Sequence, residues 1–361
     1  MDSITQIALG AAVGEATLGR KVGNKAVLWG GFVGLVPDLD ILAAPFLDVV
    51  ERFTYHRSLT HSILFTVVMS PIFGALFARI HRGSGASWRD WSLLVAAALG
   101  THWMLDVLTT YGTQIFWPLS DARVAWDSVF IIDFFYSLPL FATVIAVLFL
   151  RRDGRARRVV VTAGLALTTT YLGAGLVSKH VAGEVFERGL ARQGIQYEDY
   201  ITTPTPTNII LWRLTARTPD GYFTGYYSLL DDDDAVDLQY VPANHHLLDG
   251  LRDEWHVDRL IWFSRGFYSV ERVEGGLAFH NLIFGRLSGP GEPPGDWVFS
   301  YRIEQGPGGV AVVEREKSFE RSGAFLRAYY ERVLGRRSHD ISEPQRDRSV
   351  QDSHAAGRVD T

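Results

Sequence analysis

The chain has no cysteine, and its formal net charge is only −5. Without cysteine, disulfide bonds, thiolate-ligated zinc and cysteine nucleophiles are excluded. Basic residues do not form a stripe interleaved with aromatic side chains, so nothing indicates a nucleic-acid partner. Any metal site must therefore use histidine and carboxylate ligands, which suit zinc, manganese or iron.

Long apolar runs occur in the first half of the 361 residues and are absent from the second half. This asymmetry favours a membrane part followed by an extramembrane part over one uniform globule. A short segment, 4–18, contains Gly10 and Gly14, and we expect it to pack closely against the other helices. Five longer runs are each about the ~20 residues that span a bilayer: 26–47 (interrupted by Pro37-Asp38-Leu39-Asp40), 63–80, 91–108, 129–150 and 159–177. Residues 1–179 are thus predicted to form an α-helical membrane bundle of about five transmembrane helices plus a short N-terminal helix.

Arginine and lysine gather in alternate loops of this bundle, at 20–25, 79–89 and 151–158. Such basic loops face the cytoplasm. The opposite side then holds 38–62, 102–128 and everything after about residue 178. We therefore expect a multi-pass protein of the bacterial inner membrane with a periplasmic C-terminal domain.

The second half has the pattern of a mainly β extramembrane domain, which we place at 180–335. Its segments 208–217, 222–230, 260–273 and 277–287 mix β-branched and aromatic residues with polar ones, and turn signals separate them. The acidic run 231–234 lacks the spacing and glycine of an EF-hand and is interpreted as a solvated loop. The charged end, 336–361, has few apolar residues and is predicted to be a disordered tail.

Polar clusters interrupt the apolar half at four places. The first is Pro37-Asp38-Leu39-Asp40, and the second runs from Tyr55 to Ser62 with His56, Arg57 and His61. His56 and His61 are five apart, about 140° round a helix, so we expect a turn leading into a helix start rather than one regular helix. Taken alone, the carboxylates could be solvated in a loop, and the histidines could lie at the surface or cap a helix.

The third cluster lies within an apolar run, where His102 and Asp106 share one helix face and Thr109 extends it. An ionisable pair on a lipid-embedded helix indicates a functional site facing the bundle interior, although it could instead fix helix packing. The fourth cluster contains Asp127, a candidate helix cap, and the deeper Asp133.

Six candidate metal ligands map to the same side of the membrane, although the orientation came from Lys and Arg alone: Asp38, Asp40, His56, His61, His102 and Asp106. Had these residues alternated between sides, a joint site would have been impossible. Six is more than one zinc ion usually takes, so two metals, or one metal with a second shell, are both open.

Three motifs, in this order between the spans, resemble the inner-membrane metal-dependent hydrolases of the DUF457/YdjM type: Pro37-Asp38-x-Asp40, His56-Arg57-x-x-Thr60-His61-Ser62 and His102-x-x-x-Asp106-x-x-Thr109. The resemblance covers about residues 1–150. It includes the opening Met1 to Gln6, although many members of this family carry histidine where this chain has Gln6, and glutamine is a far poorer metal ligand. The resemblance implies hydrolase activity, because the family's His/Asp pattern is similar to that of zinc-dependent phospholipase C-like enzymes.

The leading hypothesis is a metal-dependent hydrolase at the outer face of the inner membrane, with zinc the metal most expected. Its substrate would be a phosphate ester or a membrane lipid or lipid-linked compound. Asp40 would be a ligand or the general base, and Arg57 would hold a phosphate bidentately. The alternative is a transporter or ion-coupled carrier that uses the same His/Asp cluster. A scaffold that presents the β domain is a third interpretation, but it leaves the cluster unexplained.

Overall fold

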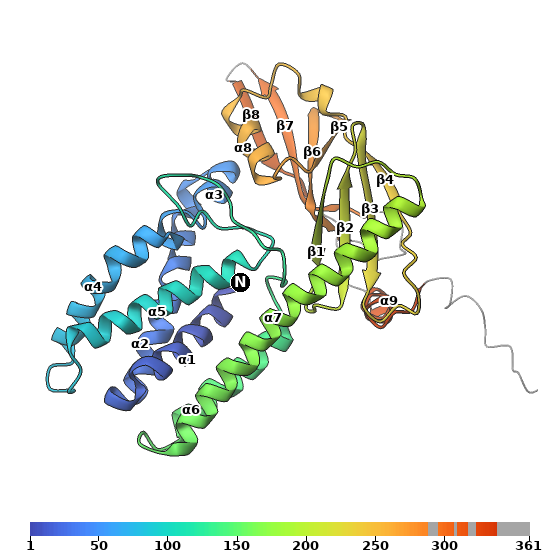
Figure 1. Cartoon of the computed structure of the whole chain (residues 1–361). Coiled ribbons are helices and arrows are strands. Elements are labelled where there is room, and N and C mark those ends of the chain that lie inside the picture. Colours follow the sequence, from blue (N-terminus) through green and yellow to red (C-terminus); the bar gives the residue numbers. More distant parts are fainter. Residues whose placement is uncertain (288–294, 307–308, 317–322, 338–361) are drawn as a thin grey trace, which may run out of the picture.

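A computed structural model describes residues 1–287, 295–306, 309–316 and 323–337 of the chain. A helical bundle lies at one end and two antiparallel sheets lie at the other, and helix α7 runs from the bundle to the sheets (Figure 1). The predicted order, helical region first and β-rich region second, is confirmed.

The bundle consists of six helices and, at one end, three short ones. The long helices are α1 (Ser3–Val22), α2 (Asn24–Leu35), α4 (Ile63–Ile80), α5 (Trp88–Val107), α6 (Phe134–Phe149) and α7 (Arg155–Arg192). The short ones are η1 (Pro37–Phe46), α3 (Val49–Tyr55) and η2 (Leu59–His61).

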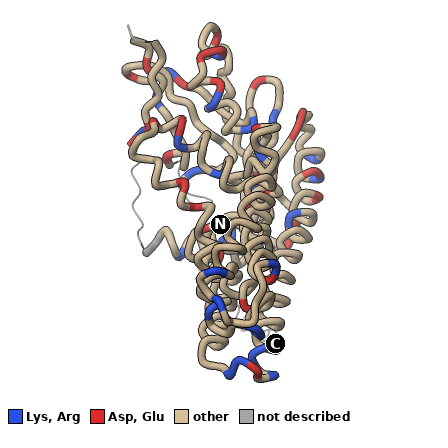
Figure 2. The backbone as a smooth tube through the Cα atoms, turned by 90° about the vertical axis from the view of Figure 1, so that its left-hand side faces the viewer, with Lys and Arg blue, Asp and Glu red and all other residues tan. Residues whose placement is uncertain are grey.

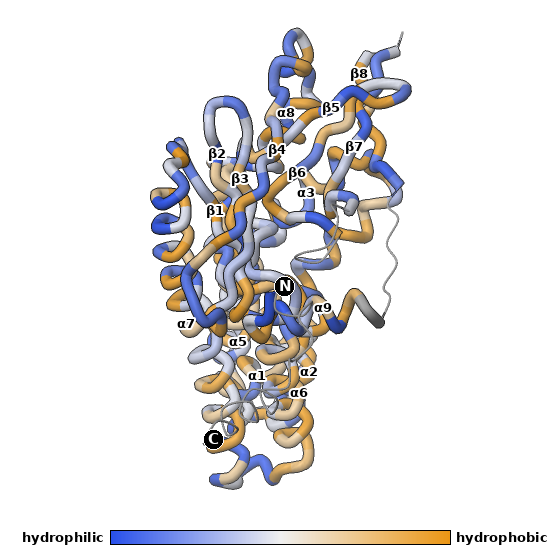
Figure 3. The backbone as a smooth tube through the Cα atoms, turned by 90° about the vertical axis from the view of Figure 1, so that its right-hand side faces the viewer, coloured by the Kyte–Doolittle hydropathy of each residue, from blue (hydrophilic) through white to orange (hydrophobic). Residues whose placement is uncertain are grey.

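Hydrophobic residues are frequent along the helices of this bundle, as the hydropathy colouring in Figure 3 shows. Helices α4 and α7 are long and apolar enough to cross a membrane, and α2 with η1, bent by 40°, forms a third candidate span. Helix α6 is apolar but has only 16 residues. Helix α4 exposes Val67 and Ile72, and its window is only 17% buried, which fits insertion into lipid.

Helix α1 packs in the middle of the bundle against α2, α5, α6 and α7. Its contact with α2 is so close that a Cβ on Gly10 would lie 2.3 Å from the carbonyl oxygen of Gly30. A Cβ on Gly14 would lie equally close to the oxygen of Ala26. Small residues thus bring the two backbones together, as expected, although the helix is longer than the predicted segment 4–18 and more than half buried.

The β-rich part contains two four-stranded meanders. The first is β1 (Asp199–Pro204), β2 (Leu211–Arg217), β3 (Gly221–Ser228) and β4 (Gln239–Pro242), and the second is β5 (Tyr268–Val273), β6 (Gly276–Arg286), β7 (Trp297–Gly306) and β8 (Gly309–Glu314). The expected strand segment 260–273 is partly wrong, because its first residues end helix α8 (Trp255–Phe263). The remaining elements are η3 (His245–Leu248) and α9 (Gly323–Val333).

The predicted boundary between the two parts, at residue 179, lies inside a helix. Helix α7 runs without a break through this residue to Arg192.

The acidic run 231–234 pairs with arginines: Arg332 Nη2 lies 2.8 Å from Asp231, and Arg192 Nη1 lies 2.6 Å from Asp234. Of the predicted tail, all but residues 336 and 337 lies outside the described residues.

The second sheet shares a hydrophobic core with the short helices at one end of the bundle. Phe53 of α3 stacks on Phe263 of α8 with ring centroids 4.5 Å apart. Arg123, in the loop between α5 and α6, donates from Nη1 to the carbonyl oxygen of Phe263 at 2.8 Å. The β-rich part is therefore fixed over the end of the bundle that carries the polar clusters.

Candidate metal centre

Four of the six candidate ligands meet inside the bundle. Asp38, His61, His102 and Asp106 are buried, and each offers one ligand atom within 4.8 Å of the others. Asp38 comes from η1, His61 from η2, and the other two from successive turns near the end of α5. The bend after α2 and the break before α4 thus direct side chains from three segments towards one point.

The spacing of these atoms suits a small cation. His61 Nε2 lies 3.4 Å from both Asp38 Oδ1 and Asp106 Oδ2. His102 Nε2 lies 3.5 Å from Asp38 Oδ1 and 3.4 Å from Asp106 Oδ2. Ligands about 2.1 Å from a tetrahedral zinc ion are separated by about 3.4 Å, which is close to these four distances.

Hydrogen bonds at the far side of each ring determine which histidine nitrogen faces the site. His102 Nδ1 lies 2.8 Å from the carbonyl oxygen of Gly34. A carbonyl only accepts, so Nδ1 carries the proton and a neutral ring presents a bare Nε2. For His61, Thr60 Oγ1 lies 3.0 Å from Nδ1 and can donate its own proton to Asp40 at 3.4 Å. It then accepts from His61, whose Nε2 is bare as well.

The inward-facing atoms have no hydrogen-bond partner among the described residues. They include His61 Nε2, His102 Nε2 and Asp106 Oδ2. Buried polar groups are normally paired, and unpaired lone pairs that face one another repel. Burial also lowers the pKa of His61 to about 4, which favours the neutral ring that metal binding needs. Imidazole and carboxylate donors in this arrangement fit a divalent metal, and the buried group could hold one.

Comparisons with known proteins match the N-terminal, helical region of this chain. The model of the YdjM inner membrane protein family matches residues 1–182. The chain belongs to this family. It is also similar to the inner membrane protein YbcI of Escherichia coli (strain K12), with 32% identity over 123 residues, which cover 33% of this chain and 69% of that protein. No solved structure matches the chain.

Asp40 and His56, the other two candidate ligands of this YdjM-family site, lie outside the four-residue group. Asp40 Oδ1 lies 2.9 Å from His56 Nδ1, and Asp40 Oδ2 lies 3.6 Å from Nδ1 of His61. His56 caps the end of α3 and its side chain is 30% exposed. In this geometry the pair lies on the Nδ1 side of His61, away from the four-residue group, and the Asp40 side chain is 15% exposed.

Asp106 Oδ1 points away from the centre and is held by three donors. Arg57 Nη2 lies 3.2 Å away, Gln6 Nε2 also lies 3.2 Å away, and the amino group of Met1 completes the set. Arg57 donates from Nη1 to Thr109 at 2.9 Å, and its Nε is unpaired. Gln6 therefore has a role that the sequence did not reveal: it helps to orient Asp106, one of the candidate ligands.

The fourth polar cluster is not part of the centre. The prediction that Asp127 could cap the next helix is wrong, because Asp133 caps α6, accepting from the backbone of Phe135 at 3.0 Å. Asp127 instead pairs with Arg265 at 2.9 Å, at the join with the β-rich part.

Sequence reasoning also missed a buried ion pair near the start of α7, towards the other end of the bundle. Glu15 Oε1 and Oε2 accept from Arg157 Nε and Nη2 at 2.7 and 2.6 Å. The one signal was Glu15 itself, an ionisable residue in an apolar segment.

Proposed function

We propose that this YdjM-family protein is a metal-dependent hydrolase whose site faces the periplasm, with zinc as the metal. The observation that carries the proposal is the pair of bare histidine nitrogens that face two buried carboxylates. Such a donor set, in which a hydrogen bond at Nδ1 holds each ring in place, is typical of metal centres.

The proposed topology has five spans formed by α2 with η1, α4, α5, α6 and α7, and a periplasmic β-rich domain. It is supported by the alternate basic loops. In Figure 2, Lys and Arg gather where α6 turns into α7, at the end of the bundle away from the sheets. The metal centre lies at the opposite end, where η1 and η2 meet α5.

A bound divalent metal would supply Lewis acidity, which makes water a stronger nucleophile at neutral pH and polarises a phosphoryl oxygen. Asp40, whose side chain is partly exposed, would take a proton as the general base, with His56 as its partner at 2.9 Å. Arg57 has an unpaired Nε and lies beside Asp106, so it would hold an anionic oxygen next to the ligands.

The apolar side chains exposed on η1 favour a lipid-linked phosphate ester as substrate. Helix η1 carries Asp38 and Asp40 and exposes Ile41, Leu42 and Phe46, the last to 88%. Exposed apolar residues of this size suit the interfacial part of a bilayer. A substrate with its phosphate at the metal centre and its lipid chains beside η1 would match both the polar site and the exposed apolar side chains.

The test is release of phosphate from lipid phosphate monoesters and pyrophosphates in mixed micelles, with the zinc-loaded full chain. We expect turnover by the wild type, a loss of about 10²-fold or more for Asp40→Asn, and no change for the control His180→Ala, whose side chain is 77% exposed. Metal binding without any turnover, together with flux of a divalent metal in proteoliposomes, would instead establish the carrier alternative.

A further inference from the structure

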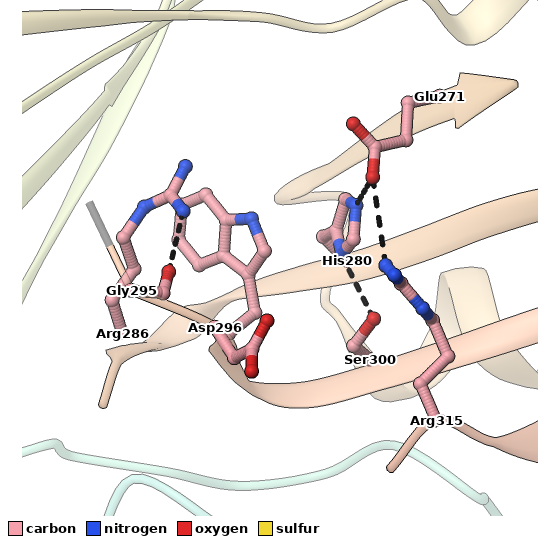
Figure 4. Close-up of a pocket in the computed structure, with 8 residues that line it drawn as sticks. Glu271, His280, Arg286, Gly295, Asp296, Ser300 and Arg315 are labelled. Carbon is pink, nitrogen blue, oxygen red and sulfur yellow. Dashed lines mark hydrogen bonds and ion pairs between the residues drawn. The ribbon is translucent and has the colours of Figure 1, made fainter. Parts of the chain in front are cut away.

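A second polar site lies in the β-rich part, away from the metal centre and outside the family match. It is a cavity of about 360 Å³ on the sheet β5–β8, lined by Glu271, His280, Arg286, Gly295, Asp296, Trp297, Ser300 and Arg315. Figure 4 shows these side chains around the cavity, with His280 between Glu271 and Ser300.

The register of the sheet places the central residues in one row. His280 of β6 is directly opposite Ser300 of β7, and Arg315 donates its backbone N–H to the carbonyl oxygen of Ser300 at 3.0 Å. Residues opposite one another in antiparallel strands share a face, so Arg315 and Ser300 project to the same side. On the other side of His280, the opposite residue is Ser269 of β5.

Two hydrogen bonds of His280 determine which atoms in this row carry the protons. His280 Nε2 lies 3.1 Å from Glu271 Oε1, and Nδ1 lies 3.0 Å from Ser300 Oγ. An ionised carboxylate only accepts, so Nε2 must carry the proton. Burial lowers the pKa of His280, which keeps the ring neutral near pH 7. Nδ1 is then bare and accepts the proton of Ser300, the direction that activates a serine nucleophile.

From this geometry we propose that Ser300 is the nucleophile of an acyl-ester hydrolase site, with His280 as base and Glu271 orienting the ring. Arg315 lies beside Ser300 and pairs only loosely with Glu271, at 3.5 Å, so its guanidinium stabilises the developing oxyanion. The assignment rests on two observations together: His280 accepts the proton of Ser300, and both residues line a cavity. A hydrogen-bond network with only a structural role would need neither feature.

The reaction balances with water as the second substrate. Ser300 Oγ bonds to the ester carbonyl carbon while its proton passes to His280 Nδ1. The ester C–O bond breaks, and the departing alcohol takes that proton. Water then attacks the acyl-serine, again through His280, and releases a carboxylic acid. The cavity wall is mostly polar, so the substrates are short-chain esters of the acetyl type rather than long fatty esters.

The first test is labelling of the full chain in detergent with an alkyl fluorophosphonate, followed by mass spectrometry of peptides. The wild type should be labelled at Ser300, and hydrolysis of 4-nitrophenyl acetate should exceed that of 4-nitrophenyl octanoate. Chelators should leave both unchanged, which separates this site from the metal centre. His280→Asn should lower hydrolysis by about 10²-fold or more. Absence of label at Ser300 in the wild type would overturn the proposal.

A matched pair of substitutions tests whether His280 activates the side chain at position 300, and this test does not depend on turnover. Because the chain has no cysteine, Ser300→Cys and Ser269→Cys each introduce a single thiol opposite His280. Only position 300 bonds to His280, since Ser269 Oγ donates to the carbonyl oxygen of Pro242 at 2.6 Å. The Ser300→Cys thiol should be alkylated by iodoacetamide at lower pH than an ordinary thiol of pKa about 8.5, whereas the Ser269→Cys thiol should not. Identical pH profiles for the two thiols would contradict the proposal.

Discussion

Nδ1 of His102 donates to the carbonyl oxygen of Gly34 at 2.8 Å, and this bond orients the imidazole ring towards the proposed metal centre. The acceptor lies at the end of α2, which is unusually close to α1. A Cβ on Gly34 would lie 2.5 Å from the carbonyl oxygen of Gln6. The packing of two glycine-rich helices therefore determines which nitrogen of His102 faces the two carboxylates.

Gly34→Ala should weaken metal binding without removing a ligand. The added methyl group would push α2 away from α1 and displace the acceptor of His102. Loss of a second-shell partner typically lowers metal affinity by about 10–100-fold. Competition with a chromogenic chelator measures this. Gly100→Ala, on the helix that carries His102, is the control, because a Cβ there meets nothing within 4 Å. Equal affinities for the two variants would contradict the role given to Gly34.

The Glu15–Arg157 pair should behave as a buried ion pair. Replacing Glu15 alone with Ala leaves a buried guanidinium, so the free energy of unfolding should fall by about 3–5 kcal/mol. Replacing both residues with apolar ones of similar size should restore most of the loss. Denaturant unfolding in micelles measures both. The control is Lys21→Ala, since the Lys21–Asp90 pair is partly exposed and should contribute no more than about 1 kcal/mol.

Phe263→Ala should loosen the join between the sheets and the bundle. Phe263 is fully buried between Phe53 and the β5–β8 sheet, and truncation of such a ring typically costs about 3–5 kcal/mol. We expect a lower unfolding temperature and faster proteolysis between the two parts. Trp255→Ala serves as the control because Trp255, on the same helix, is 44% exposed. A proteolysis rate equal to that of the wild type would argue against a fixed join.

Acid should destabilise the β-rich part through His280. Burial puts the pKa of His280 below its ordinary value of about 6.5, so between these two values the unfolded chain binds a proton that the folded chain does not. Stability therefore rises with pH across this window and is lost as pH falls below about 6.5. Thermal unfolding from pH 7 to pH 5 measures it, and His280→Asn should flatten the curve. Ser269→Ala keeps the histidine and should retain the slope; a slope unchanged in His280→Asn would assign the effect to other groups.

The sequence predicted which side of the membrane the polar clusters share, but not how close they come. Charge in alternate loops orients every span at once, so Asp38 and His102 could be placed together without coordinates. The distances between these side chains depend on the bend after α2 and on the break before α4. That is why Asp40 and His56 could not be separated from the four converging residues.

Other features could not be predicted from the sequence because they depend on tertiary contacts. The 4–18 segment looked too short for a span, yet Gly10 and Gly14 allow α1 to occupy the middle of the bundle. The pattern at the end of α8 predicts a strand because apolar residues such as Leu260 and Ile261 occur in both helices and strands. The role of Gln6 depends on a contact with Asp106, a hundred residues away, which no local pattern encodes.

Metal content of the purified chain tests the central claim most directly. Protein produced with zinc, passed through a desalting step and analysed by inductively coupled plasma mass spectrometry, should carry about one metal ion per chain. His61→Asn and Asp106→Asn should each lose most of it, whereas the exposed control His180→Asn should keep it. Wild-type protein that is folded yet metal-free, or equal metal content in all four proteins, would contradict a metal centre at Asp38, His61, His102 and Asp106.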